Sequence, residues 1–276
     1  MAQIVGAFCV PHTPFFPWRV ETEGPTCQTA QLFAEVKKHF DAARPDLVVV
    51  FDTDHLNTFF FDNLPIFAVG VADGFKGPTD EPRGGMKVYD IPSHAALATH
   101  IRRQGVDAGF DISLVQEFSV DHSVAVPLYF LTPDFRTPVI PVFISGHVPP
   151  LPKARRCFEL GRAVRNAIES WPEPLRVAVI GTGSISLEVW GPKIKRGTSD
   201  GVPAPDWVTE VCGYLQNSQI DRLIAEATEE RMQAAGSAGG ELLNIIAMLG
   251  TIDNTVPAYL APEMAHGHAY GAWRGN

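Results

Sequence analysis

Residues 47–59, Leu-Val-Val-Val-Phe-Asp-Thr-Asp-His-Leu-Asn-Thr-Phe, contain the change in character that decides the fold. The first five are apolar on both alternating sets, as expected of a strand that is covered on both faces. The apolar run then ends abruptly in Asp52-Thr53-Asp54-His55. His55 therefore follows the carboxyl end of a buried strand, which is the edge where open α/β sheets bind ligands. The alternative interpretation is a loop histidine that caps a turn.

The composition is that of an ordinary globular protein. The chain has 276 residues, of which 45% are hydrophobic and 19% are charged, enough for one large α/β domain or two small ones. It carries 22 Lys and Arg against 31 Asp and Glu, a net charge of −9, without a long basic cluster. This balance argues against a nucleic-acid or anionic-membrane surface and favours a small organic substrate.

Cysteine usage and the amino terminus bear on the cellular compartment. Cys9, Cys27, Cys157 and Cys212 are scattered without a Cys-x-x-Cys pair, so neither a zinc ribbon nor a disulfide framework is indicated. The first residues lack the basic start and apolar core of a signal peptide, and no segment approaches about 18 uninterrupted apolar residues. We therefore expect a cytoplasmic protein without a membrane segment.

Alternating strand and helix patterns indicate the fold class. Apolar residues at helical spacing predict a helix over 27–43, and Arg44-Pro45-Asp46 separates it from the strand at 47. Strand, helix and strand form a crossover unit of the parallel kind. We expect an α/β fold with a mostly parallel central sheet, helices on both faces and the active site at the carboxyl ends of the strands. Because no linker or repeat divides the chain, residues 1–276 are expected to form a single catalytic domain.

Three further histidines follow predicted strands. With the strand that precedes each, they are His12 (4–10), His122 (112–118) and His147 (139–144). A strand that leads into Asp-His occurs twice, at His55 and again at His122. Because parallel strands end at one edge of a sheet, we expect all four histidines to lie together.

A loop of small residues follows another predicted strand, at 176–180. Its sequence, Gly-Thr-Gly-Ser-Ile-Ser-Leu-Glu at 181–188, would let the backbone approach a ligand closely. A phosphate-binding loop is the rival interpretation, but the Gly-x-Gly is not completed by Gly-x-x-Gly-Lys or by Rossmann spacing. The loop at 62–90, rich in Pro, Gly and Asp, is also long enough to be functional.

Glu241 begins a segment, 241–249, that is apolar nearly all round and therefore predicts a buried helix. An ionised carboxylate there is costly to bury unless it is paired or binds a cation, although the helix dipole offsets part of the cost. The simpler alternative is an acidic first turn.

Two histidines and one buried glutamate form a 2-His-1-carboxylate set, which leaves open positions on Fe(II) for dioxygen and substrate. The candidate ligands are His12, His55 and Glu241. Their spacing in the sequence does not establish that they meet, because ligands from distant segments leave no short signature.

Several motifs strengthen this hypothesis through their order and spacing. They are Val10-Pro11-His12-Thr13-Pro14, Asp54-His55, Val120-Asp121-His122 with Val126-Pro127-Leu128, Gly181-Thr182-Gly183, Gly191-Pro192, and Gly240-Glu241 through Gly250. From about residue 3 to residue 255, the chain resembles a class III extradiol ring-cleavage dioxygenase of the protocatechuate 4,5-dioxygenase β-chain type, the LigB superfamily. The resemblance implies Fe(II) on His12, His55 and Glu241, and makes His122 the histidine that helps to place dioxygen and substrate.

One position departs from this family. Its other active-site histidine would fall at position 187, which is Leu187 here. Leucine cannot transfer a proton, so the role of base would pass to His147, to His266 or His268, or to deprotonation by the metal alone. We expect His122 and His147 to be catalytic, and Asp121, the residue before His122, to raise the pKa of that histidine. Substrate contacts are expected from Thr13, Thr182, Ser184, Ser186 and Leu187.

These observations predict a non-haem Fe(II) dioxygenase of aromatic catabolism. It would bind a dihydroxylated or related hydroxyaromatic compound and insert both atoms of O2 to cleave the ring in the extradiol (meta) manner. One alternative is an iron and O2 enzyme of the same fold that cleaves a different C–C bond. Another is a catalytically impaired binding or scaffold homologue, which Leu187 permits but a buried unpaired Glu241 argues against.

The tail at residues 258–276 has no regular period. We expect it to form a flap or a subunit contact. The expected assembly is a homo-oligomer such as a dimer, or a pairing with a small second subunit.

Overall fold

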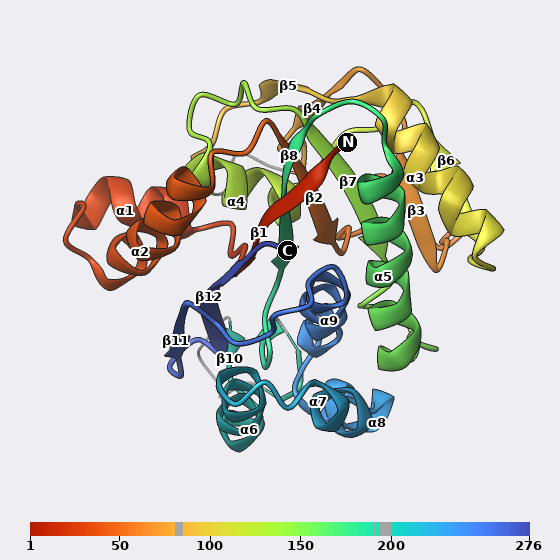
Figure 1. Ribbon diagram of the computed structural model, residues 1–276. Coiled ribbons are helices and arrows are strands. Elements are labelled where there is room, and N and C mark those ends of the chain that lie inside the picture. The colour runs from red at the N-terminus through yellow and green to blue at the C-terminus, as the bar shows by residue number, and fades with distance from the viewer. Residues whose placement is uncertain (81–84, 190, 194–199) are drawn as a thin grey trace.

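The computed structural model describes residues 1–80, 85–189, 191–193 and 200–276. Figure 1 shows a twisted central sheet with helices on both sides of it. Among the helices in the described ranges, none is long and apolar enough to cross a membrane.

The main sheet has eight strands in the order β11-β12-β1-β8-β2-β7-β3-β6. Its centre, β1-β8-β2-β7, is parallel, whereas β12 is antiparallel to β1 and β3 is antiparallel to β7. The strands are β1 (Gln3–Val10), β2 (Leu47–Asp52), β3 (Phe67–Gly70), β6 (Ile112–Val115), β7 (Val139–Ile144), β8 (Arg176–Thr182), β11 (Tyr259–Glu263) and β12 (His268–Arg274). The predicted mostly parallel sheet is therefore confirmed.

Four short strands form two small sheets outside the main one. The pairs are β4 (Gly74–Gly77) with β5 (Tyr89–Pro92), and β9 (Glu188–Val189) with β10 (Asp200–Gly201). The first pair begins within the long loop predicted at 62–90 and ends two residues beyond it, so that loop has local structure of its own.

Two helical layers cover the two faces of the sheet, and each has its own apolar core. On one face lie α1 (Phe16–Glu23), α2 (Gln28–Ala43) and α4 (His122–Leu131). On the other lie α3 (Ala95–Asp107), α5 (Ala154–Ser170) and α9 (Leu242–Gly250), followed outward by α6 (Pro205–Gln216), α7 (Ile220–Glu226) and α8 (Glu229–Ala234). All residues of β2 and of α9 are buried, which explains their continuous apolar sequences.

The parallel strands place three of the four histidines at one edge. His12, His55 and His147 follow β1, β2 and β7, which run in the same direction. His122 arrives differently, because β6 is parallel to β3 and therefore runs opposite to β7. Residues 116–121 return across the sheet, and His122 is then the first residue of α4. The predicted reason for the position of His122 was therefore wrong.

The tail at 258–276 forms the β11–β12 hairpin rather than a flap. β12 pairs with β1 and is buried over six of its seven residues. A strand covered on both faces and built from alanine, glycine and aromatic residues shows no polar alternation, so the sequence pattern did not reveal it.

Glu263 ties this hairpin together from a buried position. Its carboxylate accepts a hydrogen bond from Tyr270 at 3.2 Å and lies 3.4 Å from Nδ1 of His268 and 3.3 Å from Nδ1 of His266. Burial alone would raise the pKa of Glu263, but the two histidines lower it to about 2. The contribution of Glu263 to stability is therefore full above its unfolded pKa of 4.5 and is lost as the pH falls toward 2.

We expect Glu263→Gln to lower the free energy of unfolding at pH 7 by about 1–3 kcal/mol, because it weakens the hydrogen bonds that the buried carboxylate makes with Tyr270 and His268. The difference from wild type should narrow as the pH falls below about 4. Urea unfolding at pH 7 and at pH 3 measures both effects. Glu173→Gln, which changes an exposed carboxylate, is the matched control. Equal losses in the two variants would contradict the role of Glu263.

Candidate metal centre

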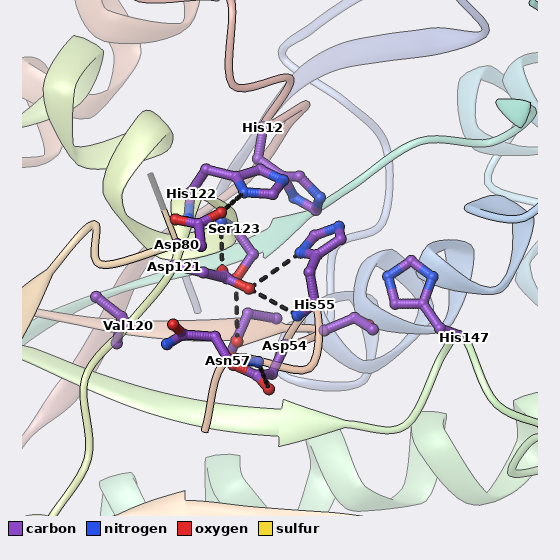
Figure 2. A network of polar contacts seen from close by, with 12 residues as sticks. His12, Asp54, His55, Asn57, Asp80, Val120, Asp121, His122, Ser123 and His147 are labelled. Atoms are coloured by element: carbon purple, nitrogen blue, oxygen red, sulfur yellow. Dashed lines mark hydrogen bonds and ion pairs between the residues drawn. The ribbon is translucent and has the colours of Figure 1, made fainter. Parts of the chain in front are cut away.

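A cavity of about 840 Å³ lies at the carboxyl edge of the parallel strands. The five titratable residues singled out from the sequence all line it: His12, His55, His122, His147 and Glu241. The ring of His55 lies 4.1 Å from that of His122, 4.7 Å from that of His147 and 5.2 Å from that of His12, measured between ring centroids. Figure 2 shows these four imidazoles gathered around one space.

Glu241 is the buried charge at the centre of the group, with an exposed fraction of 1%. It ends the 3-10 turn η2 (Gly239–Glu241), and its Oε2 accepts a hydrogen bond from the backbone N–H of Ser184 at 2.7 Å. Gly183 makes this approach possible, because its φ is +146° and a Cβ there would lie 2.4 Å from Cβ of Glu241. The loop of small residues at 181–188 therefore serves to receive a carboxylate rather than a phosphate.

Three imidazoles present Nε2 to the other oxygen of this carboxylate. The distances to Oε1 of Glu241 are 3.1 Å from His12, 3.4 Å from His55 and 3.4 Å from His147. Each ring is held through Nδ1 by a different partner. The pairs are His12 with Oγ1 of Thr182 (2.9 Å), His55 with the carboxylate of Asp121 (3.1 Å) and His147 with the carbonyl oxygen of Ser237 (3.0 Å). This is the arrangement that orients histidines in metal sites.

The directions of the pKa shifts show that Glu241 carries a negative charge at the centre of the site. Burial alone would raise the pKa of Glu241, but His12 above all, with His147 and His55, holds it well below its usual value. Burial would lower the pKa of His55, whereas Asp121 raises it well above the usual value. The pKa of His12 is lowered, chiefly by burial. Glu241 is therefore ionised, and positive charge between it and the imidazoles is favoured.

In the motif at 52–55, the first three residues have structural roles and His55 faces the cavity. Asp54 accepts backbone hydrogen bonds from residues 57–59 and so closes a turn. Thr53 bonds to the side-chain amide of Asn244 and to a carbonyl oxygen of β7. Burial, followed by repulsion from Asp121, raises the pKa of Asp52 well above its usual value. Only His55 of the four reaches the cavity.

Asp80 is a functional candidate that the sequence did not single out. Its carboxylate bonds to Nδ1 of His122 and also accepts the backbone N–H of that residue at 3.1 Å (Figure 2). Asp121, the sequence neighbour expected to act on His122, turns to His55 instead and accepts both its backbone N–H and its Nδ1–H. The expected carboxylate partner of His122 is corrected to Asp80. The sequence offered one indication of Asp80, which was the length of the predicted loop at 62–90 that contains this residue.

The residues expected to contact substrate divide into two groups. Thr13, Ser184 and Leu187 line the cavity. Thr182 is fully buried and bonds to His12. Ser186 is also fully buried, where its hydroxyl donates to the carbonyl oxygen of Ala235 and accepts from the N–H of Ala204. These last two residues shape the site from behind rather than facing a ligand.

The tail histidines lie apart from the cavity. His266 and His268 pair with Glu263, and neither is among the described residues that line the space around Glu241. Position 187 is occupied by a half-buried leucine at the cavity wall. Three histidines were proposed to replace the one missing there: His147, His266 and His268. Of these, only His147 lines the cavity among the described residues.

A transition metal fits the donors present. The candidate ligand atoms of His12, His55 and His122 lie within 4.8 Å of one another, as do those of His55, His147 and Glu241. Nε2 of His147 is buried without a hydrogen-bond partner. Imidazole nitrogens with a carboxylate oxygen suit divalent iron and its neighbours in the transition series.

The rest of the described lining is largely apolar. Pro14, Phe15, Pro78, Met86 and Val189 surround the space next to the imidazoles. An apolar cavity with a few convergent polar groups at one end is suited to an aromatic ring whose polar substituents reach those groups.

Comparison with curated proteins finds relatives that are named as dioxygenases. A 2,3-dihydroxyphenylpropionate/2,3-dihydroxicinnamic acid 1,2-dioxygenase of Photorhabdus laumondii is 32% identical over 183 residues, which are 66% of this chain and 56% of that protein. A gallate dioxygenase of Pseudomonas putida is 31% identical over 201 residues, 70% of this chain and 55% of that protein. The chain thus spans little more than half the length of these two relatives. A further 2,3-dihydroxyphenylpropionate/2,3-dihydroxicinnamic acid 1,2-dioxygenase, of Escherichia coli, is 25% identical over 88% of each chain.

The fold and the family extend over nearly the whole chain. An uncharacterized protein of Escherichia coli K12 has a similar fold, with a TM-score of 0.62 and 15% identity over 97% of this chain and 99% of its own. Residues 6–272 match the family described as the catalytic LigB subunit of aromatic ring-opening dioxygenase. The chain therefore belongs to the LigB family.

Proposed function

We propose that this protein is a non-haem Fe(II)-dependent extradiol dioxygenase that cleaves the ring of a dihydroxylated or related hydroxyaromatic compound. The observation that carries the proposal is the convergence of His12, His55 and the buried Glu241 at one end of an apolar-lined cavity. Membership of the LigB family agrees with this chemistry. The relatives are named for 2,3-dihydroxyphenylpropionate, 2,3-dihydroxicinnamic acid and gallate, which supports an aromatic substrate with adjacent hydroxyl groups.

In this proposal, His12, His55 and Glu241 hold the metal. When bound, Fe(II) would bring the substrate hydroxyls and dioxygen together and so allow both oxygen atoms to enter the ring. The protein would orient the ring with apolar walls that include Phe15 and Met86.

His122 is proposed to hold and move a proton beside the substrate. Asp80 accepts a hydrogen bond from its Nδ1, so Nε2 is the atom left free for the cavity. Thr13 and Ser184 offer hydroxyl groups in the same cavity, and Leu187 contributes only apolar surface. His147 is the second histidine proposed to act on the substrate.

Leu187 favours two alternatives, because it removes the proton-transfer group expected at its position. One is an enzyme with the same metal and O2 that cleaves a different C–C bond. The other is a binding or scaffold homologue without catalysis. The second is disfavoured by Glu241, since a buried ionised carboxylate without a cation is costly to keep.

The proposed activity can be tested by anaerobic reconstitution with Fe(II) and oxygen uptake against catechols, gallates and aminophenols. We expect one substrate class to consume one O2 per ring opened. With ¹⁸O2, mass spectrometry should find both labelled atoms in the product. Incorporation of a single labelled atom, or no uptake with any of these compounds despite bound iron, would contradict the proposed ring cleavage.

Removal of any proposed ligand should abolish tight iron binding. His12→Ala, His55→Ala and Glu241→Ala should each lower iron occupancy by roughly tenfold or more, because loss of even an outer partner costs about 10–100-fold. Metal analysis after anaerobic gel filtration measures occupancy, and circular dichroism checks the fold. His39→Ala, on α2 and stacked on Tyr259 outside the cavity, is the control. Unchanged iron content in all three ligand variants would exclude this site.

His122→Ala should lower turnover by about 10²–10⁴-fold, the usual contribution of a group that transfers a proton. Iron content should stay at the wild-type level, because His122 is not a proposed ligand. Asp80→Asn should cause a smaller loss, since it weakens the orientation of the ring and leaves the ring in place. Steady-state kinetics combined with metal analysis distinguishes these effects. Loss of iron in His122→Ala would assign this residue to the metal instead.

A further inference from the structure

We propose that His147 is a fourth protein ligand of the resting metal centre and leaves the metal when an aromatic diol binds through both hydroxyl groups. The inference rests on the proposed function, because it concerns the same metal. It changes the resting ligand set from two histidines and a carboxylate to three histidines and a carboxylate.

The distances around Glu241 are those of ligands that share one metal. Ligand atoms at about 2.0–2.2 Å from a metal lie about 3.0 Å apart at a right angle and about 3.5 Å apart at a tetrahedral angle. Nε2 atoms of His12, His55 and His147 lie 3.1, 3.4 and 3.4 Å from Oε1 of Glu241. All three distances fall in this window, and His147 is as close to the carboxylate as His55 is.

The orientation of His147 places a buried nitrogen beside the carboxylate. Its Nδ1 lies 3.0 Å from the carbonyl oxygen of Ser237, so Nε2 is the atom that faces Glu241, at 3.4 Å. Nε2 is buried and has no hydrogen-bond partner among the described residues. Histidines of metal sites are held in this way, with one ring nitrogen fixed by a backbone carbonyl and the other turned to the metal.

The position of His147 is set by contact between two backbones. Gly146 lies so close to Gly240 that a Cβ on Gly240 would come within 2.0 Å of the carbonyl oxygen of Gly146. The residue after each glycine is a proposed ligand, His147 on one side and Glu241 on the other. Close backbone packing of this kind fixes the main chains of the two residues beside each other, while the imidazole can still turn about its side-chain torsions.

His122 is placed differently, although it lies in the same cavity. Among the described residues, its ion-pair partner is Asp80, and no contact of His122 with Glu241 within 4.0 Å is present in the described part of the chain. Its ring lies 5.5 Å from that of His12, on the side of the cavity away from His147 (Figure 2). His122 is therefore the free histidine, and His147 is the ligand.

Coordination number explains why His147 has to leave. With four protein ligands, a six-coordinate metal would have two open positions, and a diol bound through both oxygens would fill them. Dioxygen needs a third position, as in the 2-His-1-carboxylate arrangement. His147 is the ligand best placed to go, because one carbonyl oxygen holds its ring, whereas Asp121 holds His55 at both the backbone N–H and Nδ1. A second cavity of about 240 Å³ borders His147 and gives its ring room to move.

Once it has left, His147 would also offer the base that position 187 lacks. Nε2 of His147 would accept the proton of a substrate hydroxyl, and the electron pair of the broken O–H bond would stay on the substrate oxygen. No oxidant or further reactant is needed. His147 would then take over the role of base from the position that Leu187 occupies.

X-ray absorption of anaerobic Fe(II)-loaded protein tests the proposal, because it counts imidazole ligands without turnover. We expect three imidazoles in the wild type, two in His147→Ala, and three in His122→Ala, the matched control from the same cavity. His147→Gln serves as a second variant if the alanine variant does not fold. Fe(II) affinity should fall at least about tenfold in both His147 variants. Addition of excess catechol without O2 should lower the wild-type count from three to two.

The outcomes separate this inference from the proposed function. An equal imidazole count in wild type and His147→Ala overturns the fourth ligand and leaves the dioxygenase intact. Three imidazoles in the wild type that remain three with bound catechol overturn the displacement. Three imidazoles that become two with catechol, but no O2 uptake with any hydroxyaromatic compound, support the ligand exchange and contradict the dioxygenase. A wild type that binds no Fe(II), Co(II) or Zn(II) overturns both.

Discussion

The charge on Glu241 is the constraint on which the rest of the site depends. Removing a carboxylate from water costs several kcal/mol, so a fold that keeps one at 1% exposure has to compensate it. One oxygen is satisfied by the backbone of Ser184 and the other faces three imidazoles. These groups come from loops after β8, β1, β2 and β7. The charge of Glu241 is therefore compensated only when β1, β8, β2 and β7 are all in their native register.

The proposed ligands are held in position by side chains that do not line the cavity. Asn244 of α9 donates to the carbonyl oxygen of Thr182 at the end of β8 and to the hydroxyl of Thr53 at the end of β2. Thr182 in turn fixes His12. One buried amide thus links the helix that follows Glu241 to the loop that carries His55 and, through Thr182, to His12. Such links keep ligand atoms within a few tenths of an ångström of their working positions.

The buried strands and the histidines that follow them could be predicted, because apolar runs and their abrupt ends are local signals. The sequence therefore predicted His12, His55 and Glu241 as one set of ligands, and the structure brings the three side chains together. It did not reveal which carboxylate orients which ring, because Asp80 and His122 are 42 residues apart and pair without any periodic pattern. Asp121 was misassigned for the same reason, since adjacency in the chain was taken for adjacency in space. The β11–β12 hairpin was missed because a doubly covered strand has no polar alternation.

The order of these groups along the chain has a consequence for biosynthesis. His12 and Glu241, 3.1 Å apart in the folded protein, are separated by 229 residues. The strand that precedes His12 is also paired on one side by β12, which follows Glu241 in the chain. A ribosome-bound chain thus displays the proposed histidine ligands long before the carboxylate that completes the set exists. The centre can form only after Glu241 has been translated, so metal capture would be coupled to the folding of segments that are far apart in the chain.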